Sequence, residues 1–365
     1  MSAWSPSSRV PPLGLRRGTG TGWACRFGHA VHRAGCRWLP PAPLAFPAAG
    51  LVYPLLTGLI PPSAFRDWPL LQASSAFRGP REVAHEDTWA VILQSSRYWF
   101  NYRHAANTLL LYRELRERGV PDSNIILMLS SDHACDGRNP EPCTVYDDFL
   151  SSRSRNNLFG DVEIDFFGPE VDPEAFVNVL LGRGDPRWPS GKFLGSGPSS
   201  NVVLYMTGHS HADIMKFQDK DVVTSNDLAG VVAEMERLGR YREMLVVTDT
   251  CQASTLSRLI SSSAVSDLHS SIRGENSYSI NHDQTLGQSM ADQLTYVMTQ
   301  ILRSPGVDES EETLADVMRR VKGKEGRRIM STARLRLSGS STPASQRPVQ
   351  EVLGWPGADA AFTAA

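Results

Sequence analysis

Two apolar stretches, Val202-Val-Leu-Tyr-Met-Thr-Gly-His209 and Met244-Leu-Val-Val-Thr-Asp-Thr-Cys251, each end in a reactive side chain. Each stretch is typical of a buried β-strand, and the 42 positions that separate His209 from Cys251 leave room for the amphipathic stretch 226–238. A strand–helix–strand crossover within one sheet is right-handed, so both strands end at the same edge. We therefore expect the imidazole and the thiol to lie close together, as a Cys–His nucleophile pair requires.

The alternation of strand and helix continues outside this unit. Apolar runs at 89–95 and 125–129 predict two more strands, and the residues 102–118, 176–181 and 288–302 predict helices. Asn226 is the expected N-cap of the helix that precedes the Cys251 strand. Repeated alternation indicates an α/β fold with a mostly parallel central sheet and helices on both faces. Open sheets of this kind carry their sites at the carboxyl edge of the strands, where His209 and Cys251 are placed.

Composition divides the chain of 365 residues into three parts. Residues 1–80 are rich in Pro, Gly, Arg and Ser and are expected to be a disordered or processed extension. Residues 86–303 carry the strand and helix pattern of a catalytic domain. Residues 304–365 contain an acidic block, a basic block and a Ser/Pro/Ala-rich end, which predicts a polar tail.

Charge and cysteine content exclude several classes of protein. A formal net charge of −2 gives no footprint for nucleic acid. No uninterrupted apolar run of about 18 residues occurs, so no transmembrane helix is predicted. The five cysteines are too few for a disulfide scaffold, and their odd number indicates at least one free or intermolecular thiol.

Several candidate residues have a structural interpretation beside the catalytic one. A lone Cys251 is typical of a buried core thiol, but its polar neighbours favour an exposed thiolate. Asn101 precedes the 102–118 helix, so it is either an N-cap or the third residue that orients the imidazole. His211 with His209 is a weak metal signal. The backbone amides of Gly208 and Cys251 are candidates for an oxyanion hole.

Four segments of the chain form a distinctive set: Arg97-Tyr-Trp-Phe-Asn-Tyr-Arg-His-Ala-Ala-Asn107, Tyr205-Met-Thr-Gly-His209, Lys216-Phe-Gln-Asp219 and Asp249-Thr-Cys-Gln-Ala253. They resemble the catalytic subunits of the GPI-anchor transamidase, which belong to the legumain-like, caspase-fold cysteine peptidases. The resemblance covers about residues 86–302 and extends faintly beyond them; a fifth segment, 273–279, is similar to the family's post-catalytic segment. The resemblance implies a caspase-like three-layer sandwich.

By this resemblance Cys251 is the nucleophile, His209 the base and Asn101 the orienting residue. The family cleaves the C-terminal attachment signal from proproteins through a thioester and transfers the new C-terminus to the ethanolamine amine of a GPI glycolipid. This is covalent acyl transfer, and the chemistry requires no cofactor. The implied location is an endoplasmic reticulum membrane complex with a lumenal catalytic domain. The implied partners are other transamidase subunits.

The resemblance also implies two structural features. One is a Ca²⁺ site formed by Asp122, the carbonyl of Ile125, Glu163 and Asp165, and hard oxygen ligands suit this ion. Without the resemblance these acids are typical of solvated surface charges. The other is an intermolecular disulfide from Cys135 to a partner subunit. The alternative for this cysteine is a local bridge to Cys143.

The sequence departs from the family directly after His209, where Ser210 and His211 replace glycines. If the loop needs positive φ angles at these positions, serine and histidine would adopt them at a higher cost than glycine. The C-terminal membrane span of many relatives has no counterpart here. Two alternative functions therefore remain open: a stand-alone legumain-type asparaginyl endopeptidase, and an inactive subunit retained for assembly.

Overall fold

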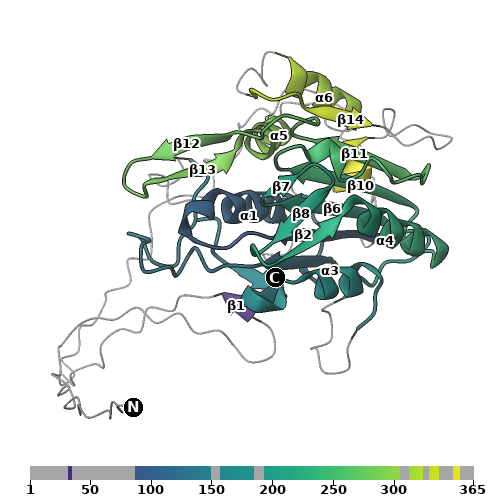
Figure 1. The fold of residues 1–365 in the computed structure, drawn as a ribbon, viewed down its shortest axis with the longest axis horizontal. Helices are drawn as coiled ribbons and strands as arrows, with labels where there is room; N and C mark the ends of the chain where they lie inside the picture. Colours follow the sequence, from purple (N-terminus) through teal and green to yellow (C-terminus); the bar gives the residue numbers. More distant parts are fainter. Residues whose placement is uncertain are drawn as a thin grey trace, which may run out of the picture.

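A seven-stranded sheet forms the centre of the molecule (Figure 1). The computed structural model describes residues 32–34, 87–148, 157–184, 193–304, 312–323, 329–336 and 348–353. Neighbouring strands follow the order β14-β11-β10-β6-β2-β3-β5, and every described pair is parallel apart from β11 with β14. The strands are β2 (Thr88–Gln94), β3 (Ile125–Leu129), β5 (Phe166–Phe167), β6 (Asn201–Thr207), β10 (Glu243–Asp249), β11 (Val265–His269) and β14 (Arg334–Arg336). The predicted α/β architecture with a mostly parallel sheet is confirmed.

Helices cover both faces of this sheet, because its central strands carry apolar side chains on both sides (Figure 1). In β6 every residue is buried. Val203 and Tyr205 face the first helical layer, while Val202 and Leu204 face the second. The first layer contains α1 (Tyr102–Glu117), α5 (Gln293–Arg303), α6 (Leu314–Lys322) and α7 (Val349–Leu353), and the second contains α3 (Pro173–Leu180) and α4 (Ser225–Arg237).

Two details differ from the sequence predictions. The N-cap of α4 is Thr224, whose hydroxyl accepts from the Asp227 amide while the Asp227 carboxylate accepts from the Thr224 amide, so Asn226 is not the cap. The expected helix over 288–302 is shorter, because its first five residues form β13 (Gln288–Asp292). This strand pairs with β12 (Ser279–Asp283) in an antiparallel hairpin.

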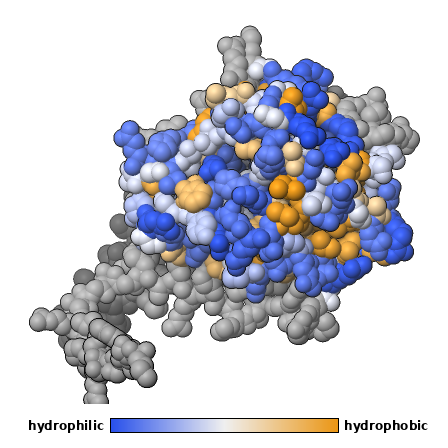
Figure 2. All heavy atoms as spheres, viewed as in Figure 1, coloured by the Kyte–Doolittle hydropathy of each residue, from blue (hydrophilic) through white to orange (hydrophobic). Residues whose placement is uncertain are grey.

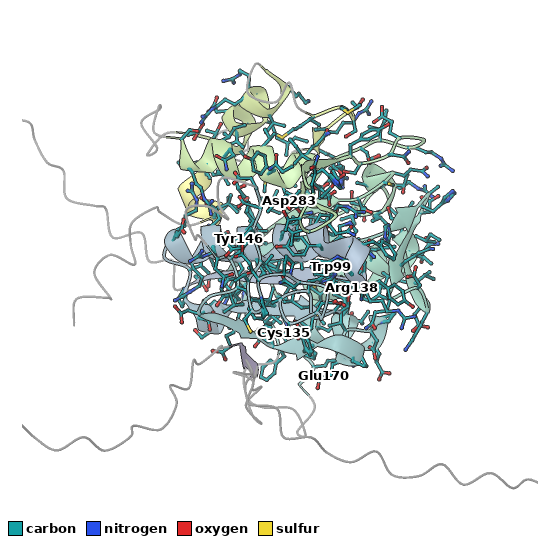
Figure 3. The ribbon with its side chains drawn as sticks, turned by 90° about the vertical axis from the view of Figure 1, so that its left-hand side faces the viewer. Trp99, Cys135, Arg138, Tyr146, Glu170 and Asp283 are labelled. Carbon is teal, nitrogen blue, oxygen red and sulfur yellow. The ribbon has the colours of Figure 1, made fainter. Side chains whose placement is uncertain are left out.

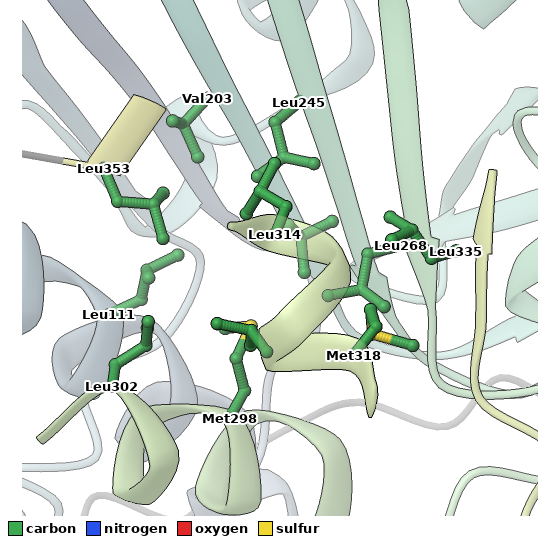
Figure 4. Close-up of a pocket in the computed structure, with 12 residues that line it drawn as sticks. Leu111, Val203, Leu245, Leu268, Met298, Leu302, Leu314, Met318, Leu335 and Leu353 are labelled. Carbon is green, nitrogen blue, oxygen red and sulfur yellow. The ribbon is translucent and has the colours of Figure 1, made fainter. Parts of the chain in front are cut away.

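The described parts of residues 304–365 are packed on the domain, which differs from the prediction of a polar tail. The apolar side chains of α6 recur at helical spacing and are buried in the first helical layer. They line a small apolar space between α5, α6, α7 and the sheet (Figure 4). Strand β14 adds to the edge of β11. The charged side chains on one face of α6 led to the prediction of a polar tail, but the opposite face is apolar and completes the core.

Several short strands form smaller sheets outside the main sheet. A hairpin sheet of β7 (Ser210–His211), β8 (Ile214–Phe217) and β9 (Asp221–Thr224) follows β6. Strand β1 (His32–Ala34) pairs antiparallel with β4 (Val162–Ile164); the rest of the predicted extension 1–80 lies outside the described residues. The described helices include none that is both long and apolar enough to cross a membrane. The face shown in Figure 2 is mostly hydrophilic, with smaller apolar areas.

Candidate active site

His209 and Cys251 follow directly on the carboxyl ends of two adjacent parallel strands. Thr207 of β6 pairs with Asp249 of β10, and both residues of interest lie two positions beyond this pair. The two chains stay together past the strands, since the Thr250 hydroxyl donates to the Gly208 carbonyl at 2.9 Å. Cys251 is half-buried and is the free cysteine of the described residues. The parallel sheet therefore brings the thiol and the imidazole to one edge, as predicted.

Gly208 makes the close approach at this edge possible. Its φ is +156°, and a Cβ at this position would lie 2.1 Å from the Ser95 hydroxyl oxygen. Ser95 itself continues from β2, with its amide donating to the Thr207 carbonyl at 3.0 Å. A side chain at position 208 would push the ends of β2 and β6 apart, so only glycine fits here.

Asn101 orients the imidazole of His209. The Asn101 Oδ1 atom lies 2.8 Å from His209 Nε2, and its Nδ2 donates to the Arg97 carbonyl at 2.6 Å. A carbonyl can only accept, which fixes the orientation of the amide and leaves Oδ1 to accept from His209. Nε2 of His209 therefore carries the proton and Nδ1 carries the lone pair. Asn101 makes no capping bond to α1, so its side chain serves the imidazole and not the helix.

The surroundings of His209 favour its neutral form. Its ring packs edge-on against His104 at 5.2 Å and lies 6.5 Å from the Phe100 ring. Burial lowers the pKa of His209 below its ordinary value, and the nearby positive charges of Arg103 and Lys216 lower it further, while Asp219 opposes them. A neutral imidazole with a free Nδ1 is the state that a general base needs.

Sequence reasoning missed a buried polar cluster behind His209. His104 Nδ1 lies 2.6 Å from the Ser96 hydroxyl, and its Nε2 lies 3.6 Å from a carboxylate oxygen of Asp292. Asp292 also accepts from Arg103 at 3.1 Å and from Asn107 at 2.6 Å. Burial raises the pKa of Asp292 to about 7, against the opposing charge of Arg103. The segment after Asn101 carried a signal for this cluster, since it holds Arg103 and His104, but Asp292 is 188 residues from His104 and its burial follows from the fold.

The family departure at positions 210 and 211 fits the fold without strain. Neither Ser210 nor His211 has a positive φ, so neither position requires glycine. Both residues form β7, which pairs with β8. The Ser210 hydroxyl donates to the Cys251 carbonyl and lies 2.9 Å from the Thr250 hydroxyl. Ser210 therefore connects the loop after His209 to the loop that carries the nucleophile.

The residues expected to bind Ca²⁺ lie near one another without converging as a ligand set. Asp122 accepts from the Tyr112 hydroxyl, and the Glu163 amide lies 3.4 Å from the same oxygen. Asp165 accepts from the Leu127 amide at 2.9 Å, which engages one of its carboxylate oxygens. Among the described residues no group of three His, Cys, Asp or Glu side chains is arranged to hold a metal. His209 and His211 likewise belong to no such group among the described residues.

Cys135 lies on the segment that connects β3 with β4 (Figure 3). Its sulfur atom is 3.5 Å from that of Cys143, and its amide donates to Asp132. Cys135 is half-buried, whereas Cys143 is buried. Both cysteines are disulfide-bonded in the structure, but at 3.5 Å their sulfur atoms are too far apart to be bonded to each other. The local bridge is therefore not shown, and an intermolecular bond from Cys135 stays a prediction.

Known proteins resemble the chain over the region that forms this site. It is 41% identical over 232 residues to the GPI-anchor transamidase of Mus musculus, which is 63% of this chain and 57% of that protein. It is 39% identical over 237 residues to the GPI-anchor transamidase of Schizosaccharomyces pombe, covering 65% of this chain and 62% of that protein. The chain thus spans less than two thirds of the length of these relatives.

Comparison with solved structures gives a weaker likeness. Caspase-1 of Spodoptera frugiperda matches 68% of this chain and 88% of its own, with a TM-score of 0.37 and 10% identity. The sequence profile of the Peptidase C13 family matches residues 88–353. This range includes the strand tips of the site and the C-terminal elements packed on the sheet. The chain belongs to the Peptidase C13 family of cysteine peptidases.

Proposed function

We propose that this chain is the catalytic subunit of a GPI transamidase. One observation carries the proposal: the bond from His209 to Asn101 leaves a lone pair on His209 beside the loop of a free, half-buried Cys251. Relatives named GPI-anchor transamidase support the reaction that we propose for this pair. Cys251, His209 and Asn101 are the nucleophile, the base and the orienting residue.

The first step forms a thioester and breaks the peptide bond. His209 Nδ1 takes the proton of the Cys251 thiol, and the thiolate attacks the carbonyl carbon of the scissile bond. The resulting oxyanion is held by backbone amides, for which those of Gly208 and Cys251 are the candidates. When the tetrahedral intermediate collapses, His209 returns the proton to the departing nitrogen. The cleaved C-terminal signal leaves and the proprotein remains on sulfur.

The second step exchanges sulfur for nitrogen. The ethanolamine amine of a GPI glycolipid attacks the thioester carbon, and His209 accepts the proton that the amine loses. The carbon–sulfur bond breaks and Cys251 leaves as a thiolate, which regains the proton from His209. An amide bond then joins the proprotein to the glycolipid. Attack by water in place of the amine would give a free carboxylate, which is the outcome for an endopeptidase.

Competition by a small amine tests this proposal. In membranes that contain the whole complex, hydrazine should compete with the GPI amine and yield soluble protein with a C-terminal hydrazide. Mass spectrometry of the new C-terminus separates hydrazide from carboxylate. Exclusive carboxylate at high hydrazine would favour the legumain-type endopeptidase. No product of either kind from a folded, assembled complex would favour the inactive subunit.

The setting of the reaction is part of the proposal. A transamidase of this kind works in an endoplasmic reticulum membrane complex with its catalytic domain in the lumen and with other subunits as partners. Cys135 is proposed to bond to one of them. Non-reducing electrophoresis of the complex should then give a larger band that disappears in Cys135→Ser and persists in Cys143→Ser. A Cys135–Cys143 peptide pair found by mass spectrometry would contradict this link.

Ca²⁺ binding by Asp122, Ile125, Glu163 and Asp165 rests on the family resemblance alone, and no step of the reaction depends on it. If the ion binds there, adding Ca²⁺ to the chelated complex should raise its melting temperature. Asp165→Asn should weaken this response. An unchanged melting temperature at millimolar Ca²⁺ would contradict the proposal that the ion binds there.

A further inference from the structure

Two exposed aromatic side chains lie beside the catalytic imidazole. Tyr98 is 45% exposed and Phe100 is 54% exposed. Their rings are stacked at 5.9 Å, and the Phe100 ring lies 6.5 Å from that of His209. We call Arg97, Tyr98 and Phe100 the aromatic ledge. Large apolar side chains left in water at the mouth of a site indicate a ligand contact.

The backbone of this ledge is fixed in a costly conformation. Tyr98 has a φ of +75°, and bulky residues in this region carry a strain of roughly 1–3 kcal/mol. The strain is supported by hydrogen bonds to the Tyr98 carbonyl from buried His133 at 2.8 Å and from the Asn101 amide at 3.0 Å. Trp99, which lies between Tyr98 and Phe100 in the sequence, is buried and packs edge-on against Tyr102 at 5.4 Å. The exposed rings are therefore held in place and not merely left outside.

The ledge offers ring faces and has no free carbonyl. The Arg97 carbonyl accepts from Asn101 at 2.6 Å, and the Phe100 carbonyl accepts from Arg103 at 2.9 Å. Since the Tyr98 carbonyl is engaged as well, this backbone lacks the row of unpaired carbonyls that strand addition uses. A ligand on the ledge must instead contact flat aromatic surfaces.

Arg97 adds a positive charge to the ledge. Its guanidinium lies 4.6 Å from the centre of the Tyr98 ring. Within the described part of the chain it forms no ion pair with a carboxylate, and its Nε is buried without a hydrogen-bond partner. The two terminal nitrogens of such a guanidinium suit a phosphate group, which they can bind through two parallel hydrogen bonds. Aromatic faces next to such a cation match a sugar that carries a phosphate.

We infer that the aromatic ledge binds the sugar-phosphate part of the amine acceptor, an inference that rests on the proposed function. Two carbon atoms separate the amine of phosphoethanolamine from its phosphate ester. The phosphate and sugar of the acceptor therefore extend outward from an amine positioned at the Cys251 thioester. The ledge also leads outward from His209, past the Phe100 and Tyr98 rings to the Arg97 guanidinium. Asn101 holds both His209 and the ledge, so the acceptor site and the base move as one unit.

Partition between two acceptors tests the inference in the intact complex. Hydrazine lacks both sugar and phosphate, so the ratio of GPI-linked product to hydrazide isolates the contribution of the ledge. Tyr98→Leu keeps a side chain of similar apolar character on the same strained backbone but removes the flat ring. Tyr98→Leu and Arg97→Gln should each lower the ratio by roughly tenfold, the loss of one charged or aromatic contact. Tyr98→Phe should keep the ratio of the unmodified chain.

Leu238→Ala is the matched control, since Leu238 is 41% exposed at the end of α4, away from the strand tips. It should leave the ratio unchanged. An unmodified ratio in Tyr98→Leu and Arg97→Gln overturns the inference. A fall in both products at constant ratio also overturns it, because the ledge would then bind the proprotein. Loss of co-purifying subunits in Tyr98→Leu would make the ledge a subunit contact and overturn it too. If the unmodified complex yields neither product, the proposed function itself fails.

Discussion

Two histidines lie at the carboxyl ends of strands that flank β10, and they have opposite surroundings. His209 follows β6 and bonds through Nε2 to a neutral amide, which leaves its Nδ1 without a partner among the described residues. His269 ends β11, where its Nε2 lies 2.5 Å from Asp267 and 2.9 Å from the Ser257 hydroxyl. Serine, histidine and aspartate are the residue types of a hydrolytic triad. Both partners contact the same nitrogen, however, so His269 cannot be oriented by one and take a proton from the other.

Access separates the two sites as well. The side chains of His269 and Asp267 are 4% and 2% exposed, and Arg336 of β14 closes over them with a bond to Asp267 at 2.5 Å. Burial alone would raise the pKa of Asp267, but the hydrogen bonds from His269 and Arg336 outweigh it and the pKa is lowered. The Asp267–Arg336 ion pair joins β14 to β11, so its role is structural. The comparison teaches that a histidine at a strand end can act as a base only when one of its ring nitrogens is left free to take a proton.

Removing the nucleophile or the base should have the largest effect. Cys251→Ala and His209→Ala should each reduce GPI attachment by roughly 10⁴-fold or more, and the double variant should be little worse, because both groups act in one step. A GPI-anchored reporter in cells depleted of the native chain measures this. Ser257→Ala is the control at the other histidine and should retain attachment. Rescue by either Cys251→Ala or His209→Ala would break the assignment.

Asn101→Ala should cause a smaller loss of activity. The orienting amide fixes the tautomer of His209 but forms no bond to substrate, so roughly 10- to 1,000-fold less attachment is expected. Folding should be retained, because Asn101 makes no capping bond to α1. The reporter assay, together with the melting temperature of the complex, separates the two effects. Activity equal to that of the unmodified chain would show that His209 needs no orienting partner.

Asp267→Ala should destabilise the fold without altering the chemistry. It leaves the buried His269 without its carboxylate hydrogen-bond partner, which costs about 1–3 kcal/mol, whereas the half-exposed Arg336 can be solvated by water. Denaturant unfolding measures the free energy, and attachment per folded complex should match that of the unmodified chain. If the free energy of unfolding were unchanged while attachment fell strongly, the second histidine would belong to the active site after all.

The smallest expected effect concerns pH. Because the pKa of His209 is lowered, its imidazole stays neutral to a lower pH than an ordinary histidine, so the acid limb of signal cleavage, measured as the sum of both products, should lie below about 6.5. Lys216→Gln removes one of the positive charges that lower this pKa and should move the limb upward. Lys220→Gln, a neighbouring exposed lysine, should leave it in place. A limb that moves downward in Lys216→Gln would contradict this electrostatic account.

The sequence predicted the catalytic edge well because local patterns determine it. Strands that are apolar along their whole length predict a parallel sheet, and a parallel sheet places the ends of β6 and β10 side by side. Asn101 was found as a candidate, but its choice between helix and imidazole depends on the contact with His209, which joins positions 108 residues apart.

Other parts of the fold were not predicted because long-range contacts override the local pattern. Strand β11 is entirely buried yet carries Asp267 and His269, whose burial depends on Arg336 from the distant β14. Residues 288–292 resemble the helix that follows them, but pairing with β12 makes them a strand. The charged run before residue 323 concealed the buried face of α6, which includes Leu314, Val317 and Val321 at helical spacing.

The pairing of β14 with β11 has a consequence for biosynthesis. Strand β14 and helix α7 are made after every other described element, yet they cover the edge of the sheet and complete its first helical layer. A nascent chain that has reached only Arg303 therefore exposes the unpaired edge of β11 and the apolar side chains beneath α6. Such an edge invites pairing with other chains, so synthesis of this protein passes through a stage at which a chaperone would be needed to shield it.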